Sequence, residues 1–260
     1  MTKRLFDIVA AGFGLIVTAP IVLASIVGIR LSSPGPVFYC PQRAGRNGCP
    51  FTVIKLRTMH VARSGSSSRI TASGDQRVFR FGALLRKLKV DELPQLLNVL
   101  RGEMSLIGPR PEDLSIVQDE YGDLGWKTLQ VRPGLAGVSS IFNYTHGELM
   151  LLDGDAERIY FERLLPLKLA LEAIYIERES LVYDVRLAVR TLFVLAGIAA
   201  GREEFAHPPE YADAVALLTA ASHSSTNDAA GNTNDNTLPA TIPFVRPPQL
   251  PPAPPKRRAA

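Results

Sequence analysis

Residues 8–29 read IVAAGFGLIVTAPIVLASIVGI and contain 22 consecutive uncharged residues. As a straight α-helix this segment would be roughly 33 Å long, which is enough to cross the hydrocarbon core of a bilayer. Pro20, however, lies near its middle, where a proline removes one backbone hydrogen bond and kinks a helix. The segment therefore predicts an apolar membrane helix that is interrupted at Pro20.

Basic residues flank both ends of this segment. Lys3 and Arg4 precede it and Arg30 follows it, although positive charge favours the cytoplasmic side of a membrane. A re-entrant hairpin, which enters one leaflet, turns at Ala19 and Pro20 and returns, keeps both basic ends on the cytoplasmic face, and we favour it. A straight crossing, a cleaved signal peptide and a buried helix of a soluble protein are the alternatives. No small-residue cleavage site follows the apolar run.

The positive charge of the chain is concentrated in one region. The formal net charge is +4, but residues 30–110 contain 14 Lys and Arg against four acids, a local excess of +10. Such a block indicates an anionic partner, whether nucleic acid, lipid headgroups or the phosphates of a small substrate. The chain has 260 residues, 46% of them hydrophobic, which is sufficient for a packed core. Cys40 and Cys49, with no histidine close by, are interpreted as reduced thiols.

Short strands and loops are expected after the apolar segment, followed by a helix. Residues 32–50 are rich in Gly and Pro around VFY and predict a loop, a strand and a turn, and FTVIKLRTM at 51–59 predicts a strand. Residues 62–75 lack apolar periodicity and are expected to form a mobile loop over the site. Helical spacing with a basic face returns at 77–90.

A second helical region follows, and then a tail. Residues 150–200 predict helices whose last part is apolar enough to lie against a membrane surface or pack under the hairpin. The composition then changes to Ala, Ser, Thr and Asn and ends in RPPQLPPAPPKRRAA, which is typical of a disordered, proline-rich tail. We therefore expect an α/β, mainly helical fold in three parts. These are a re-entrant membrane hairpin (1–31), a small cytoplasmic and interfacial catalytic domain with amphipathic interfacial helices (32–205), and the tail (206–260).

Residues 89–112, KVDELPQLLNVLRGEMSLIGPRPE, contain the candidate site. Asp91 suits a helix N-cap, and Pro94 would lie in the first turn, where its missing N–H does little harm. Arg101 and Gly102 would end the helix. Its apolar face would consist of Leu93, Leu96, Leu97 and Leu100.

Asp91 and Glu92 need a reason beyond capping, because one acid suffices for a cap and adjacent carboxylates raise each other's pKa unless a cation intervenes. Arg110 lies between Pro109 and Pro111, which restrict the backbone and so fix the direction of the guanidinium. A fixed arginine suits bidentate recognition of phosphate, and paired carboxylates suit Mg²⁺ that bridges substrate phosphates. This pattern indicates phosphoryl transfer, in which one carboxylate attacks phosphorus and the other holds the metal. The simpler interpretation is an N-cap with a solvated neighbour.

Further cations would join this site if the fold brought their segments to it. They are Lys55, Arg57, Arg86 and Lys87.

Five motifs together carry a resemblance to a known family. They are KRLFDIVAAGFGLIVTAPIVL, SSPGPVFY, FTVIKLRTM, LLRKLKVDELPQLLNVLRGEMSLIGPRPE and VRPGLAG. In this order and spacing they closely resemble the bacterial sugar transferase family of small monotopic phosphoglycosyl transferases. The resemblance is strong over most of residues 3–137 and weaker over LPLKLALEAIYIERESLVYDVRLAVRT.

The resemblance implies an activity. Members of that family transfer a sugar phosphate from a nucleotide diphosphate sugar, usually a UDP-sugar, to undecaprenyl phosphate, with release of the nucleotide monophosphate. They act at the cytoplasmic face of the bacterial inner membrane, so membrane lipid is an expected partner. Carried over to this chain, Asp91 is the nucleophile, Glu92 is the Mg²⁺ ligand, and Ala19 and Pro20 match the break of the re-entrant helix. Phosphate binding is expected for Lys55, Arg86, Arg110 and Arg132, to which we add Arg57 from the strand pattern.

The chain also departs from the family pattern. Lys89 and Val90 stand where the family often has Ser or Thr before the acids, Gln76 replaces a usual Pro, and Ala136 stands where Thr is common. The common Gln-containing motif is replaced by VSSIFNYTHGE at 138–148. The resemblance therefore implies nothing about the identity of the sugar.

Two functions of other classes compete with this interpretation. A nucleic-acid binder would explain the basic segment as an imitation of a helix-turn-helix, but it leaves the apolar N-terminus unexplained, so we expect no nucleic-acid partner. A membrane-anchored scaffold whose proline-rich tail recruits partners is compatible with catalysis. A homodimer stays open.

Overall fold

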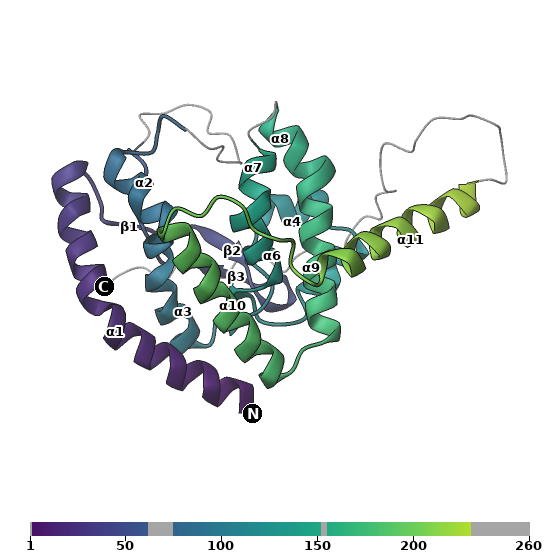
Figure 1. Cartoon of the computed structure of the whole chain (residues 1–260), viewed down its shortest axis with the longest axis horizontal. Coiled ribbons are helices and arrows are strands. Elements are labelled where there is room, and N and C mark those ends of the chain that lie inside the picture. Colours follow the sequence, from purple (N-terminus) through teal and green to yellow (C-terminus); the bar gives the residue numbers. More distant parts are fainter. Residues whose placement is uncertain (1, 62–74, 152–154, 230–260) are drawn as a thin grey trace.

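The computed structural model describes residues 2–61, 75–151 and 155–229, with side chains up to residue 221 (Figure 1). The predicted mobile loop at 62–75 lies outside these residues except for Asp75. The α-helices are α1 (Thr2–Ser32), α2 (Arg80–Lys87), α3 (Leu96–Arg101), α4 (Leu114–Glu120), α5 (Asp123–Thr128), α6 (Val138–Phe142), α7 (Glu148–Met150), α8 (Ala156–Ile159), α9 (Leu165–Glu177), α10 (Leu181–Ala199) and α11 (Tyr211–Ala229). Two 3₁₀ helices are η1 (Arg46–Gly48) and η2 (Val90–Gln95), and two π-helical turns are η3 (Asn143–Gly147) and η4 (Tyr160–Leu164). The strands are β1 (Phe38–Tyr39), β2 (Gln42–Ala44), β3 (Pro50–Thr52), β4 (Lys55–Leu56), β5 (Ser105–Ile107) and β6 (Gly134–Ala136).

Helix α1 is one continuous helix of 31 residues that includes Pro20. The predicted interruption at Ala19 and Pro20 was therefore wrong, because both residues are helical. A proline removes a single backbone hydrogen bond, and the turns on either side of it can continue the helix around a bend. Figure 1 shows this bend, since the axis of α1 changes direction between its two ends.

Both ends of α1 are bonded to the rest of the chain. At its start, Lys3 Nζ lies 2.5 Å from Asp184 Oδ2 on α10. At its end, Ile29 is fully buried, and Arg57 Nη1 donates a hydrogen bond of 2.9 Å to the hydroxyl of Ser33. One domain therefore holds the two ends of this helix.

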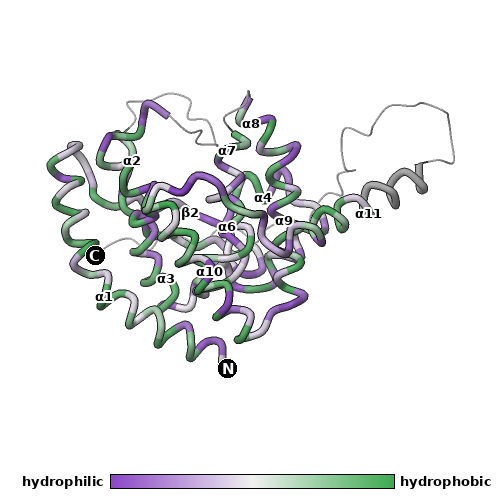
Figure 2. The backbone as a smooth tube through the Cα atoms, viewed as in Figure 1, coloured by the Kyte–Doolittle hydropathy of each residue, from purple (hydrophilic) through white to green (hydrophobic). Residues whose placement is uncertain are grey.

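The outer face of α1 is apolar and exposed. Among the described residues, α1 is the one helix long and apolar enough to cross a membrane. Figure 2 shows hydrophobic residues along most of its length. The large exposed side chains include Leu5, Val9, Phe13, Ile16, Val17, Leu23 and Val27.

Three two-stranded sheets connect the helices. Strand β1 pairs with β4 and β2 pairs with β3, both antiparallel, whereas β5 pairs with β6 in parallel. The strand predicted for 51–59 is thus two short strands that pair with different partners. Next to these two strands, the backbones of Gly108 and Gly134 lie in close contact: a Cβ added to Gly134 would lie 2.1 Å from the nitrogen of Gly108. Only glycine fits there, and this contact fixes where the Pro-Arg-Pro segment begins.

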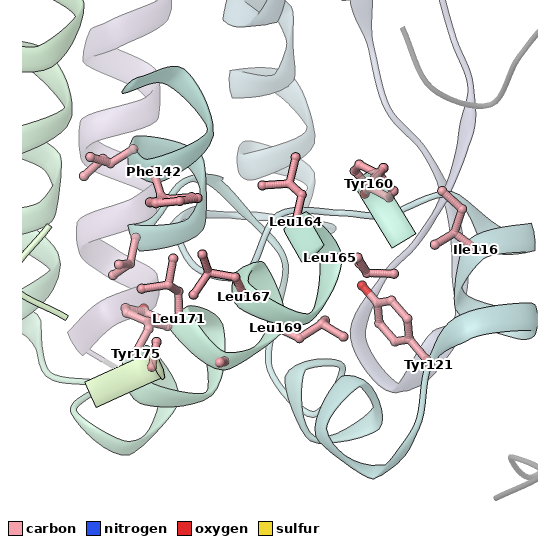
Figure 3. Packing of buried hydrophobic residues seen from close by; sticks show 14 of the residues in the cluster. Ile116, Tyr121, Phe142, Tyr160, Leu164, Leu165, Leu167, Leu169, Leu171 and Tyr175 are labelled. Atoms are coloured by element: carbon pink, nitrogen blue, oxygen red, sulfur yellow. The ribbon is translucent and has the colours of Figure 1, made fainter. Parts of the chain in front are cut away.

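Helix α9 forms the centre of the main core (Figure 3). Residues 167–175 are all buried, as is typical of a helix that is surrounded on every side. Two of them are charged and paired: Lys168 Nζ lies 2.9 Å from Glu112 Oε2, and Glu172 accepts a hydrogen bond of 2.9 Å from the backbone N–H of Arg110. The core therefore also supports the segment that carries Arg110.

The predicted tail begins too early. Helix α11 packs on α9, and Ala214 is fully buried. Glu210, just before α11, accepts hydrogen bonds from Tyr183 at 2.7 Å and from Arg190 at 2.8 Å. The stretch YADAVALLTAA is rich in alanine and leucine, which favour helix. Disorder from residue 206 was therefore wrong as far as residue 229, and residues 230–260 lie outside the described part.

Candidate active site

The two adjacent acids lie in the 3₁₀ helix η2 between α2 and α3. Asp91 and Glu92 are 8% and 7% exposed, so neither is a solvated surface residue. The N-cap role predicted for Asp91 was wrong, because α3 begins five residues later and η2 follows Lys89, whose φ is +54°. That left-handed conformation is uncommon for a residue with a side chain. It turns the chain sharply and places both acids in the interior.

Glu92 lies among cations. Its Oε1 is 3.0 Å from Lys55 Nζ and 2.5 Å from Arg110 Nη2. Its Oε2 accepts longer hydrogen bonds of 3.3 Å from Arg110 Nη1 and from the hydroxyl of Tyr144. Strand β4 supplies Lys55, the segment after β5 supplies Arg110, and η3 supplies Tyr144, so three distant parts of the chain meet at one carboxylate.

These contacts set the protonation of the group. Burial alone would raise the pKa of Glu92, but Arg110 and Lys55 outweigh it and hold that pKa well below its usual value. Burial lowers the pKa of Lys55, and the charge of Glu92 opposes this. Burial likewise disfavours the charged form of Arg110, but Glu92 outweighs it and raises the pKa of Arg110. The pair of Glu92 and Arg110 is therefore ionised across the physiological range.

Asp91 has the opposite environment. Its Oδ1 is buried and has no hydrogen-bond partner. Burial, followed by the negative charge of Glu92, raises the pKa of Asp91 to about 6, against the opposing charges of Lys55 and Lys89. At neutral pH Asp91 is therefore mostly an ionised carboxylate with one poorly solvated oxygen, which makes it more reactive than an exposed aspartate.

The donor set fits Mg²⁺ that arrives with a phosphate ligand. Among the described residues, no group of three or more His, Cys, Asp and Glu forms a cage made of protein alone. Mg²⁺ usually needs only one or two carboxylates and completes its shell with water and substrate phosphates. Asp91 Oδ1 has no hydrogen-bond partner and Glu92 lies beside it, paired with Lys55 and Arg110, so these two carboxylates are the groups that could contribute oxygen ligands.

Comparison with known proteins identifies the family. A family model described as bacterial sugar transferase matches residues 1–197. The chain belongs to the bacterial sugar transferase family. The resemblance inferred from the five motifs is thereby confirmed, and the chain is a transferase.

Several relatives of this sugar transferase have named activities. A UDP-glucose:undecaprenyl-phosphate glucose-1-phosphate transferase of Caulobacter vibrioides is 38% identical over 196 residues, which are 74% of this chain and 68% of the relative. A UDP-N-acetylgalactosamine-undecaprenyl-phosphate N-acetylgalactosaminephosphotransferase of Aeromonas hydrophila is 36% identical over 201 residues, 76% of this chain and 44% of the relative. The exopolysaccharide production protein ExoY of Rhizobium meliloti is 39% identical over 159 residues, 54% of this chain and 69% of the relative. The matched region thus spans from under half to about two thirds of these relatives.

Some basic residues predicted for the site of this sugar transferase lie elsewhere. Arg57 is buried, donates to Pro36 and Ser33, and fastens the end of α1. It is two residues from Lys55, but β4 ends between them, so the two side chains do not share one strand face. Arg132 is tied to the end of α3, because its Nε donates a hydrogen bond of 2.9 Å to the carbonyl of Gly102. Arg86 is close enough for its charge to lower the pKa of Asp91.

The site also contains residues that the sequence did not single out. Tyr144 contacts both Glu92 and Arg110. Lys89 Nζ lies 4.2 Å from the centre of the Tyr144 ring and 2.7 Å from Glu148 Oε1. The sequence did mark this region, because VSSIFNYTHGE at 138–148 departs from the family pattern, but we interpreted that departure only as a lack of information about the sugar. It is instead the segment that completes the surroundings of Glu92.

Proposed function

We propose that this sugar transferase moves a sugar 1-phosphate from a nucleotide diphosphate sugar, with a UDP-sugar as the first choice, to undecaprenyl phosphate. The named relatives support the general reaction, since their names describe transfer of this kind from UDP-sugars to that lipid. The observation that carries the mechanism is the unpartnered oxygen of Asp91 beside a Glu92 that already holds two cations.

The reaction proceeds in two steps. Asp91 Oδ1 attacks the phosphorus that bears the sugar, the bond from this phosphorus to the bridging oxygen breaks, and nucleotide monophosphate leaves with the bonding electrons. A phosphate oxygen of the lipid then attacks the aspartyl phosphosugar, which forms the lipid diphosphate sugar and regenerates the carboxylate of Asp91. In the transition state of both steps the phosphorus is surrounded by negatively charged oxygens, and Lys55 and Arg110 stabilise this charge.

Lys55 and Arg110 are already in place because Glu92 serves as their counter-ion. The diphosphate of the donor is a stronger competitor for a bidentate arginine than a single carboxylate. When it enters, it takes over these cations and leaves Glu92 available as a metal ligand. Mg²⁺ bound by Glu92 would neutralise the diphosphate and lower the charge on the leaving nucleotide, while Asp91 stays free to attack.

The membrane arrangement follows from α1. Its two ends are held by one domain, and its outer face is apolar between them. Burial of this face in one leaflet would keep both ends on the domain side, whereas a straight crossing would pull one end away from its partners. We therefore propose that α1 is a re-entrant helix that enters one leaflet from the cytoplasmic face of the bacterial inner membrane, lies deepest at its bend and returns to the same face. The exposed apolar residues of α10, such as Leu192 and Phe193, would lie at the same interface.

The mechanism is tested with purified full-length protein, Mg²⁺ and a panel of nucleotide diphosphate sugars in the absence of lipid. With the correct sugar, nucleotide monophosphate should appear up to about one equivalent, and the peptide that contains Asp91 should gain the mass of the sugar phosphate. Asp91→Asn should abolish both signals, whereas Asp123→Asn, which removes an exposed carboxylate at the start of α5, should leave them unchanged. Nucleotide release that requires polyprenyl phosphate, with no adduct, would instead mean direct transfer.

A further inference from the structure

The hydroxyl of Tyr144 lies between the two charged groups that the mechanism uses. It is 3.2 Å from Arg110 Nη1 and 3.3 Å from Glu92 Oε2. A phenol can accept from the guanidinium and donate to the carboxylate at once. Tyr144 is therefore the one neutral group among the described residues that bridges this ion pair.

The element that carries Tyr144 is unusual. Residues Asn143–Gly147 form the π-helical turn η3 between α6 and α7. Single π turns within helices are rare and often occur at functional sites. Within this turn, the hydroxyl of Thr145 donates a hydrogen bond of 2.9 Å to the carbonyl of Ile141.

Tyr144 and the helix that follows it also contact Lys89, which lies just before Asp91 and Glu92 at the start of η2. Lys89 has its ammonium over the Tyr144 ring and its ion pair with Glu148 on α7, one turn further along. Lys89 is one of two non-glycine residues with positive φ in the described part of the chain. A strained backbone persists only when its surroundings hold it, and Tyr144 and Glu148 provide such contacts.

We propose that Tyr144 is a positioning residue that holds Arg110, and with Lys89 the start of η2, in the orientation required to receive the diphosphate of the donor. The identity of the ligand rests on the proposed function, whereas the contacts of Tyr144 are observed independently of it. Tyr144 acts through Arg110, so it needs no contact with the substrate. A tyrosine hydroxyl is protonated at neutral pH, so it is able to donate to Glu92 while it accepts from Arg110.

The alternative is that Tyr144 merely fills space. In that case the ring matters and the hydroxyl does not, and any loss of binding should come with a loss of stability. Tyr144→Phe separates these possibilities because it keeps the ring over Lys89 and removes only the hydroxyl. The matched control is Tyr183→Phe, which removes a phenol that donates 2.7 Å to the carboxylate of Glu210 outside the site.

The experiment measures binding of inorganic pyrophosphate with Mg²⁺ to the full-length protein by calorimetry, beside thermal unfolding. Tyr144→Phe should weaken pyrophosphate binding about 3- to 10-fold, as expected for a long hydrogen bond to a charged group, with an unchanged unfolding midpoint. Tyr183→Phe should leave the affinity unchanged. In an Arg110→Lys background the effect of Tyr144→Phe should shrink to less than about twofold, because coupled residues are not additive.

Two results would overturn the inference. One is an affinity for pyrophosphate that is equal in wild type and Tyr144→Phe. The other is a loss of affinity that is the same with and without Arg110→Lys, which would show that Tyr144 does not act through Arg110. Since pyrophosphate is not a sugar nucleotide, a chain that binds it as described but transfers no sugar phosphate would contradict the proposed function and leave the role of Tyr144 intact.

Discussion

Asp91 and Glu92 are adjacent and almost equally buried, yet their carboxylates have opposite surroundings. Glu92 accepts hydrogen bonds from Lys55 and Arg110, whereas Asp91 Oδ1 accepts none. Their pKa values shift in opposite directions as a result, upward for Asp91 and downward for Glu92. Such divergence between neighbouring acids is typical of a site that gives them different tasks.

The rate of the first chemical step should depend on pH through Asp91. The attacking carboxylate must be ionised and its pKa is about 6, so kcat/KM for nucleotide release should fall about tenfold per pH unit below that value. Lys55→Gln removes a charge that lowers this pKa, so the midpoint should move to higher pH. Lys127→Gln, which removes a surface partner of Glu177, is the control and should leave the midpoint in place. A midpoint that stays near pH 6 in Lys55→Gln would show that another group controls the rate.

Asp91→Asn should make the protein more stable while making it inactive. An acid with a raised pKa binds its proton more tightly in the folded state, so wild type loses stability as pH rises from about 4, the unfolded value, through about 6. The amide avoids this loss. At pH 7.5 the free energy of unfolding should exceed that of wild type by roughly 1–3 kcal/mol, given ~1.4 kcal/mol per pKa unit.

Well below pH 4 the side chain at position 91 is neutral in the folded and the unfolded state of both proteins, so the stability difference between Asp91→Asn and wild type should vanish there. Denaturant unfolding in detergent at pH 3 and pH 7.5 measures it. An equal difference at the two pH values would mean that packing, and not charge, separates the two proteins.

Both ends of α1 should be accessible from the cytoplasm only. Single cysteines at Thr2 and at Ser32, both exposed, should react with an impermeant thiol reagent only in inside-out vesicles. Cys40 and Cys49 are exposed and free, so they are first replaced by serine. Labelling of the two positions from opposite sides would establish a spanning helix. Pro20→Leu should increase that spanning fraction, because it restores the missing hydrogen bond of the helix.

Two truncations should differ sharply. Ending the chain after Phe205 removes Glu210 and buried Ala214, so the unfolding midpoint should fall by at least about 5 °C, corresponding to a loss of roughly 2 kcal/mol or more. Ending it after Ala229 removes a stretch whose composition predicts no packed structure, and nucleotide release should stay within about twofold of wild type. Full stability of the shorter form would show that α11 is not needed by the core.

The family and the position of the candidate site were predictable because they depend on local sequence motifs. Asp91 and Glu92 are adjacent in the chain, and the prolines on either side of Arg110 restrict its backbone locally. The apolar segment was predictable as a long helix for the same reason, since its 22 consecutive uncharged residues are a local feature.

The residues that completed the site depended on long-range packing. Tyr144 reaches Glu92 across 52 positions, and no local pattern connects them. Arg57 looked equivalent to Lys55 because a strand repeats every two residues, but β4 stops after Leu56. The N-cap role predicted for Asp91 was wrong because Lys89 has a positive φ. Local sequence preferences do not predict this, since glycine or asparagine is the usual residue in that conformation.

The contact between Lys3 and α10 sets an order of events during synthesis. Tyr175 and Asp184, the partners of Lys3, follow it in the chain by 172 and 181 positions. At typical elongation rates that interval is on the order of 10 to 40 seconds. Val99 and Ser105, which bond Arg4 and Asp7 of the same helix, are made about halfway through this interval, so the two halves of the contact set of α1 become available at different times. The start of α1 can be fastened to α10 only after residues 175 and 184 have been made, so this contact is a late step of folding.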